Sequence, residues 1–449
     1  SRKKWRTIMG KKKVLPANAP VWITEELKIS EPLYCWMFLR KHPMRYIGDT
    51  FFNEDGTITD VALLKQEICS DISGWVTSKL ANKVNDLWNA MKMLAAADEI
   101  PIHTDRIHVA NGTLYLDGRF MEEKQYCRNR LTVAYNPDAP TPERWLEFLR
   151  QLLEEEDIPT LQEYLGYCLL PVTKAQKMMM IIGRGGEGKS RIGIVMNALL
   201  GKAMNTTSIQ KVENDKFARA DQGNKLLMVD DDMDMNALKK TNYIKSIVTS
   251  EGKMDVEKKH AQSFQDQLYV RFLCFGNGVL TALHDRSDGF FRRQIILTTK
   301  DKPAGRVDDP YLVEKLIQEK EGIFLWCLEG LKRLIANDYH FTISDRARAN
   351  IASAIKEANN IFDFLASEGY VEFIDGGEAG TAELYKAYVD WCNDNAENSF
   401  SMKSFSTTLA QNAERYHLTP TNNVYAGKGK RCRGYQGIQI YDPDNPFIK

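Results

Sequence analysis

The stretch from Lys177 to Leu200, "KMMMIIGRGGEGKSRIGIVMNALL", decides the fold, because an apolar run breaks into glycines and then resumes with helical spacing. It fits the pattern GxxxxGKS, with a buried strand expected before the loop and a helix after it. Such a loop wraps backbone N–H groups around phosphate oxygens, while its lysine bridges the β- and γ-phosphates and its serine ligates Mg²⁺. The alternative is a plain glycine-rich turn. The predicted nucleotide-binding residues are Gly183, Gly185, Gly186, Glu187, Gly188, Lys189, Ser190 and Arg191.

Three consecutive acids follow a second apolar run in "NKLLMVDDDMD". The run suits a strand buried on both faces, and it ends abruptly in Asp230, Asp231 and Asp232. Adjacent carboxylates at a strand's end can hold a Mg²⁺ shell and orient an attacking water. We therefore predict a Walker B motif, with Ser190 and Asp230 at the metal, although the register among the three acids stays open. The alternative is that the acids cap a helix starting near Met235.

Two further polar groups flank later strand patterns. "LYVRFLCFGN" ends in Asn277, whose amide is expected to fix the water that attacks the γ-phosphate. "HDRSDGFFRRQIIL" places Arg292 and Arg293 just before another apolar strand, where a guanidinium can reach a neighbouring subunit's nucleotide. Taken singly, the first is also compatible with a plain turn and the second with a surface pair.

In this order the motifs resemble superfamily 3 helicases, in particular the poxvirus-type and the phage or plasmid primase-helicases, over roughly residue 106 to the C-terminus. The resemblance implies an AAA+ core with a parallel sheet, and so an α/β fold. The residue patterns on either side predict a mainly helical N-terminal domain before this core and a winged-helix-like α+β domain after it. It also implies ATP and Mg²⁺ as cofactors, a homo-oligomeric and hexameric ring, and 3′-to-5′ translocation on single-stranded or forked DNA. Matched to the family, the catalytic residues are Lys189, Asp230, Asp231, Asn277, and Arg292 or Arg293 as the arginine finger.

The family also has a pore hairpin between Walker B and the strand that ends in Asn277. The matching stretch, "IKSIVTSEGKMDVEKKHAQSFQDQLYV", clusters Lys258, Lys259 and His260 between two short strand-like patterns. A positive tip there would contact DNA phosphates, whereas the alternative is a solvated turn. This sequence departs from the family at Walker B, which often ends in Asp-Glu or Glu-Glu, so the catalytic acid is open.

The chain's 449 residues and 43% hydrophobic content indicate a globular protein of about three domains. "DISGWVTSKLANKVNDLWNAMKML" has the spacing of one amphipathic helix, and "RIHVANGTLYLDGRF" carries two turn pairs between short strands. We expect a helical lid over "DPYLVEKLIQEKEGIFLWCLEGLKRLI". The predicted parts are a mainly helical region 1–100, a small β region with a helical collar 101–170, an ATPase core with lid 171–340, and a winged-helix-like domain 341–449.

The last hundred residues favour a DNA-binding module. Helix "TAELYKAYVDWCND" is followed by "SMKSFSTTLAQNAERY", with Ser401 as N-cap, and then by the basic loop "GKGKRCRGY" and a strand. Tyr425 and Tyr435 are expected to pack or to stack. A solubilising loop on a small α+β domain is the competing interpretation. The predicted phosphate contacts are Lys403, Lys428, Lys430, Arg431 and Arg433.

Charge and cysteine usage bound the remaining possibilities. The net charge is zero, with 60 basic and 60 acidic residues, so DNA contact must come from local basic patches. The eight cysteines are scattered without metal-binding spacing, and no apolar run approaches the roughly 18 residues of a membrane span. We expect reduced thiols, no membrane partner, and the cytoplasm of a bacterial host carrying a phage, plasmid or other mobile element.

Other functional classes stay open from the sequence. The chain fits an ATP-hydrolysing origin-binding initiator or DNA remodeller that does not unwind processively. A P-loop kinase or GTPase is the second alternative, against which no NKxD guanine motif follows the loop. The first hundred residues are too short and too helical for a priming domain. We therefore expect either that priming resides on a separate primase or polymerase, a candidate partner, or that an upstream portion is missing.

Overall fold

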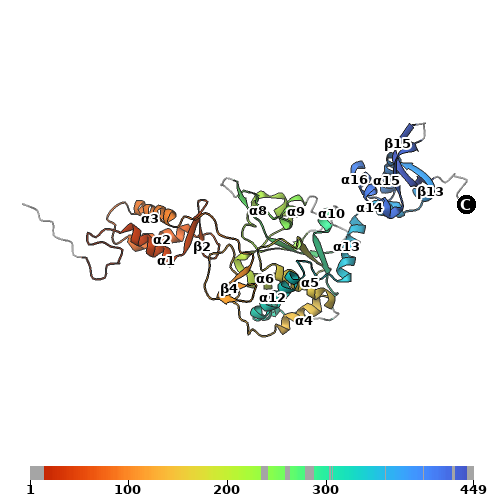
Figure 1. The fold of residues 1–449 in the computed structure, drawn as a ribbon. Helices are drawn as coiled ribbons and strands as arrows, with labels where there is room; N and C mark the ends of the chain where they lie inside the picture. The colour runs from red at the N-terminus through yellow and green to blue at the C-terminus, as the bar shows by residue number, and fades with distance from the viewer. Residues whose placement is uncertain are drawn as a thin grey trace, which may run out of the picture. The chain divides into compact units, whose positions relative to one another are not determined.

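The computed structural model describes residues 15–233, 241–257, 263–278, 288–302, 305, 307–358, 360–397, 399–426 and 430–441. They group into two compact units, the first formed mainly by residues up to Ala347 and the second mainly by those from Arg348 onward (Figure 1). No helix within the described ranges is long and apolar enough to cross a membrane.

The first unit begins with a small helical region that has its own hydrophobic core around Tyr34, Leu87 and Trp88. One correction concerns the helix predicted across residues 71–94, which is two helices separated by residues 73–79. Ser73 and Gly74 end the first helix, and Lys79 has a positive φ of 55°. The elements are α1 (Glu31–Lys41), β1 (Met44–Ile47), β2 (Thr50–Asn53), α2 (Val61–Ile72) and α3 (Leu80–Leu94).

A three-stranded antiparallel sheet and two helices follow. The pair Asp117-Gly118 lies between β4 and β5, as its sequence predicts. The turn between β3 and β4 is Ala110-Asn111, one residue before the predicted pair, because Gly112 already pairs with Val109 as the first residue of β4. Its apolar side chains join the large core of the unit, together with the buried indole of Trp145. The elements are β3 (Arg106–Val109), β4 (Gly112–Tyr115), β5 (Phe120–Met121), α4 (Glu143–Leu152), the 3-10 turn η1 (Glu155–Asp157) and α5 (Ile158–Tyr167).

The centre of the unit is a five-stranded, wholly parallel sheet of order β12-β6-β11-β8-β7, which confirms the predicted α/β class. Its strands are nearly continuous apolar runs, as a sheet covered on both faces requires. The strands are β6 (Met178–Gly183), β7 (Met204–Thr206), β8 (Leu227–Met233), β11 (Arg271–Asn277) and β12 (Gln294–Thr298).

Helices cover this sheet on both sides (Figure 1). Val229 and Phe275 of the sheet lie against Gly193 of α6, and the hydroxyl of Tyr164 in α5 donates to the carbonyl of Phe272. The predicted lid helix is interrupted at Glu319, whose carboxylate accepts from the first N–H groups of α4. The elements are α6 (Ser190–Leu200), η2 (Gly201–Ala203), α7 (Ile209–Asn214), α8 (Lys216–Ala220), α9 (Asn242–Val248), α11 (Leu312–Ile317) and α12 (Lys320–Ala336), with the hairpin β9 (Met254–Val256) and β10 (Phe264–Asp266).

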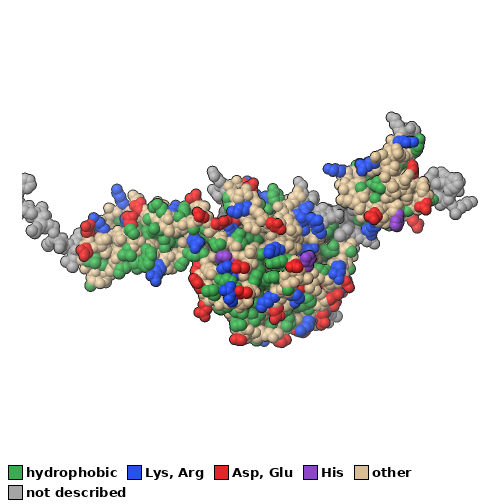
Figure 2. Space-filling view, in the orientation of Figure 1, with side chains coloured by type: hydrophobic (Ala, Val, Ile, Leu, Met, Phe, Trp, Pro, Cys, Tyr) green, Lys and Arg blue, Asp and Glu red, His purple; other side chains and the backbone are tan. Residues whose placement is uncertain are grey.

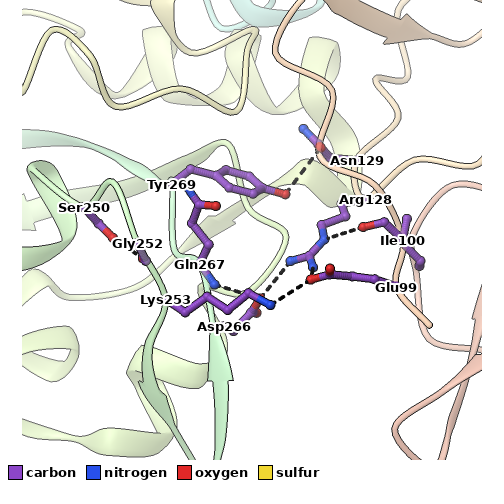
Figure 3. Close-up of polar contacts among 10 residues, drawn as sticks. All are labelled: Glu99, Ile100, Arg128, Asn129, Ser250, Gly252, Lys253, Asp266, Gln267 and Tyr269. Atoms are coloured by element: carbon purple, nitrogen blue, oxygen red, sulfur yellow. Dashed lines mark hydrogen bonds and ion pairs between the residues drawn. The ribbon is translucent and has the colours of Figure 1, made fainter.

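A polar junction ties the end of the N-terminal helical region to this hairpin (Figure 3). The guanidinium of Arg128 lies 2.7 Å from Asp266, 3.2 Å from Glu99 and 3.0 Å from the carbonyl of Ile100. Lys253, one residue before β9, reaches the same Glu99 carboxylate at 3.2 Å. The start of β9 and the end of β10, which pair with each other, are therefore both held by groups from residues 99–128.

The second unit has the element order helix, strand, helix, helix, strand, strand, with a three-stranded antiparallel sheet of order β13-β15-β14. Ser401 accepts from the N–H of Ser404, which confirms the predicted N-cap. Its elements are α14 (Asn360–Ala366), β13 (Val371–Gly380), α15 (Thr381–Asp394), α16 (Met402–Gln411), η4 (Glu414–Tyr416), β14 (Thr419–Ala426) and β15 (Lys430–Ile440). Helix α13 (Asp345–Ala358) runs from the first unit into this one, and the short α10 (Asp288–Phe291) groups with it.

Candidate functional site

The glycine-rich loop joins the C-terminal end of β6 to the first turn of α6, which begins at Ser190. Gly185, Gly186 and Gly188 have φ angles of +107°, +82° and +104°, which L side chains rarely adopt. A β-carbon at Gly183 would collide with Thr299 and with the carboxylate of Glu187. The local sequence therefore permits a tight loop at the start of a helix, where N–H groups converge on an anion site.

Lys189 lies inside this loop, and its side chain is only 6% exposed. Its ammonium donates to Glu187 Oε2 at 2.7 Å and to Asn277 Oδ1 at 3.0 Å. Glu187 Oε1 accepts from the backbone N–H groups of Arg184 at 2.6 Å and Gly185 at 2.8 Å. Burial alone would raise the pKa of Glu187, but Lys189 and the backbone donors outweigh it and lower that pKa.

The three aspartates at the end of β8 lie in different environments. Asp230 is 5% exposed and accepts from the N–H of Ile209 at 2.8 Å, and burial raises its pKa. Asp231 and Asp232 are exposed. Asn277 Nδ2 donates to Asp232 Oδ1 at 3.4 Å, so Asn277 lies between Lys189 on one side and the aspartates on the other. This arrangement follows from the sheet order, because β11 lies between β6 and β8.

These groups are suitable for binding Mg²⁺ together with a triphosphate. A Mg²⁺ ion usually keeps several waters and binds through one or two carboxylates plus phosphate oxygens. Ser190 at the start of α6 and the exposed carboxylates of Asp231 and Asp232 supply oxygen donors of this kind. The lysine supplies a fixed positive charge beside them.

Arg293 lies at the opposite end of the parallel sheet from the glycine-rich loop. The carbonyl of Arg293 accepts from the N–H of Met178, the first residue of β6, whereas the loop follows its last residue. Along a six-residue strand this separation is roughly 20 Å. Arg293 is half-buried and the preceding Arg292 is exposed. Arg293 is therefore too far to contact a nucleotide in the loop of its own subunit.

The predicted DNA contacts are only partly described. Four of them lie outside the described residues: Lys258, Lys259, His260 and Lys428. Lys430 is the first residue of β15, and only its backbone is described. Lys403 near the start of α16, Arg431 and Arg433 are all exposed. The Arg431 guanidinium lies 5.6 Å from the ring centre of Tyr425, which is 66% exposed, whereas Tyr435 is buried in the core. Of the two tyrosines, only Tyr425 presents a ring to solvent.

Sequence reasoning missed how Glu187 and Asp232 are used. Glu187 belongs to the predicted loop, but its pairing with Lys189 depends on the side chain folding back into the loop. The register of β8 and β11 shifts between the pairs Cys274–Asp230 and Gly276–Met233. This irregularity brings Asp232 close to Asn277. The sequence signal for the Glu187–Lys189 pair is that a carboxylate stands inside a phosphate-binding pattern.

Comparisons with known proteins support the fold. Residues 181–293 match DUF5906, which is described as a family of unknown function, and no curated protein matches the chain. The apo structure of the C-terminal region of NrS-1 is similar at 12% identity and a TM-score of 0.54, over 91% of this chain and 100% of that one. An A-form apo structure of the same region gives a TM-score of 0.53 at 12% identity, over 90% and 99%. The chain thus shares the fold of the NrS-1 C-terminal region over nearly its whole length.

Proposed function

We propose that this protein is an ATP-dependent DNA helicase of a phage, plasmid or other mobile element, acting as an oligomeric ring. The observation that carries the proposal is the hydrogen-bonded series Lys189, Asn277, Asp232, which joins the ends of three adjacent strands. At the carboxyl ends of these strands, the lysine can bind phosphates, the amide can orient a water and the carboxylate can bind Mg²⁺. These three tasks are the ones that nucleoside triphosphate hydrolysis requires.

The position of the arginines favours a ring. Because Arg293 lies roughly 20 Å from the loop of its own subunit, it could serve as an arginine finger only for the nucleotide of a neighbouring subunit. A P-loop kinase or GTPase that works alone has no evident use for such a pair. The resemblance to superfamily 3 helicases assigns Arg292 or Arg293 the same role.

The second unit supports DNA as the partner. Its element order is that of a winged-helix module, in which α16 would be the recognition helix and β14–β15 the wing. Lys403 is the second residue of α16, where recognition helices contact DNA. Arg431 and Arg433 are two residues apart in β15, the spacing of side chains on one face of a strand, and Arg431 pairs with Tyr425. In Figure 2 several Lys and Arg side chains lie along the upper edge of this unit, and acidic side chains lie toward its right and lower edges.

Unwinding of a forked duplex with ATP tests the proposal. Lys189→Ala should abolish both ATP hydrolysis and strand separation, because the triphosphate loses its fixed cation. Lys202→Ala, an exposed lysine just beyond α6, is the matched control and should leave both rates unchanged.

The remaining outcomes separate the other functions. DNA-stimulated hydrolysis without strand separation would reject the helicase and favour an origin-binding initiator or remodeller. A strictly monomeric ATPase with no response to DNA would reject both and favour a P-loop kinase or GTPase.

A further inference from the structure

The loop of the candidate site already contains an anion of its own. The Glu187 carboxylate takes two backbone N–H groups, from Arg184 and Gly185, and the ammonium of Lys189. These are the donor types with which such a loop binds phosphate oxygens. A side-chain carboxylate thus uses part of the binding capacity that a nucleotide needs.

The pair is enclosed within the loop. Glu187 is 4% exposed and Lys189 is 6% exposed, and the carboxylate packs so closely on Gly183 that a β-carbon there would lie 2.8 Å from it. Charges at such depth are screened far less by salt than surface charges are. The Lys189 charge is therefore largely neutralised before any nucleotide arrives.

We propose that Glu187 is an internal counter-anion that occupies Lys189 in place of a nucleotide phosphate and thereby lowers the affinity of the site for nucleotide. The inference rests on the proposed ATP function. An incoming triphosphate must share Lys189 with Glu187 or displace it, and the carboxylate repels the phosphates at close range. Glu187 acts through Lys189, so it is a positioning residue that sets how tightly substrate and product are held.

A purely structural role for Glu187 makes the opposite prediction. If the carboxylate only braces the loop through Arg184 and Gly185, removing its charge leaves nucleotide binding unchanged or weakens it. If it competes for Lys189, removing its charge tightens binding. The two possibilities therefore differ in the sign of the change.

Glu187→Gln separates them, because its amide oxygen still accepts from the two backbone N–H groups while the charge is gone. We expect the Kd of the full-length chain for fluorescent Mg-ATP and Mg-ADP analogues to fall on the order of tenfold, with KM for ATP falling in parallel. Asp301→Asn is the matched control. It removes one negative charge that pairs with Arg184 of the same loop at 3.3 Å, but both side chains are more than two-thirds exposed, so the Kd should change less than about twofold.

The outcomes distinguish this inference from the proposed function. Unchanged or weaker binding by Glu187→Gln, in a chain that melts like the wild type, overturns the inference while the ATP site stands. Should that variant melt early, Glu187→Asn also removes the charge and is held to the same criterion. If the wild type binds no nucleotide and Lys189→Ala makes no difference, the proposed function falls, and the inference falls with it.

Discussion

Replacing Arg128 by alanine should detach the N-terminal helical region from the β9–β10 hairpin. The Arg128 and Asp266 side chains are 11% and 15% exposed and lie 2.7 Å apart, and the same guanidinium donates to the carbonyl of Ile100. Breaking a fully buried ion pair costs ~3–5 kcal/mol, whereas an exposed pair contributes ~0.2–1 kcal/mol. With both partners mostly but not completely buried, we expect a loss of about 2–4 kcal/mol of local stability.

Hydrogen exchange measures this loss where it occurs, because a chain of several units has no single unfolding free energy. Protection should fall around residues 99–100, 253–257 and 263–269 and stay unchanged in β6 and β8. Lys253→Ala is the control, since it breaks only an ion pair to Glu99 in which both side chains are more than half exposed. Equal losses in the two variants, or a loss that extends into β6 and β8, would refute the assignment of Arg128 as the junction.

Three further changes have defined outcomes. Gly166→Ala should lower the melting temperature strongly, because its β-carbon would collide with the backbone of α12, whereas Gly252→Ala meets nothing within 4 Å and should have little effect. Burial lowers the pKa of His108 to about 3, so the unfolded state takes up a proton at a higher pH than the folded state. The free energy of unfolding of the first unit, which contains His108, should therefore fall by up to ~1.4 kcal/mol per pH unit as the pH drops below about 6.5. His108→Gln should flatten that slope in urea denaturation, and an unchanged slope would contradict the assignment. Lys403→Ala and Arg431→Ala should each reduce the slope of log K for DNA binding against log salt concentration by about 1. An unchanged slope would show that the replaced residue does not contact a DNA phosphate.

The sequence predicted the core because its signals are local. The strand that ends in Gly183, the helix that begins at Ser190 and the strand that ends in Asn277 are runs of six, eleven and seven consecutive residues. The turn at Asp117-Gly118 and the cap at Ser401 are likewise predicted from neighbouring residues, and the turn at Asn111 was predicted one residue too late. The α/β class and the meeting of the loop with Asn277 follow from such signals once the sheet is parallel.

Contacts between distant residues escaped prediction. Arg128 and Asp266 are 138 positions apart, and nothing in the local pattern marks either as the other's partner. The break at residues 73–79 was missed because the apolar spacing continues through Val76 even though the backbone is not helical there. In both cases tertiary packing decided what periodicity left open.

The parallel sheet also affects how this chain is made. Strand β6 pairs with β11 and β12, which begin only at Arg271 and Gln294. At 5–20 residues per second, a ribosome needs roughly 5–20 s to make the intervening segment, during which both edges of an apolar strand have no partner. Early exposure of "MMMII" makes the nascent chain prone to aggregation, and we expect the yield of folded protein to depend on chaperones and on the speed of translation between residues 183 and 294.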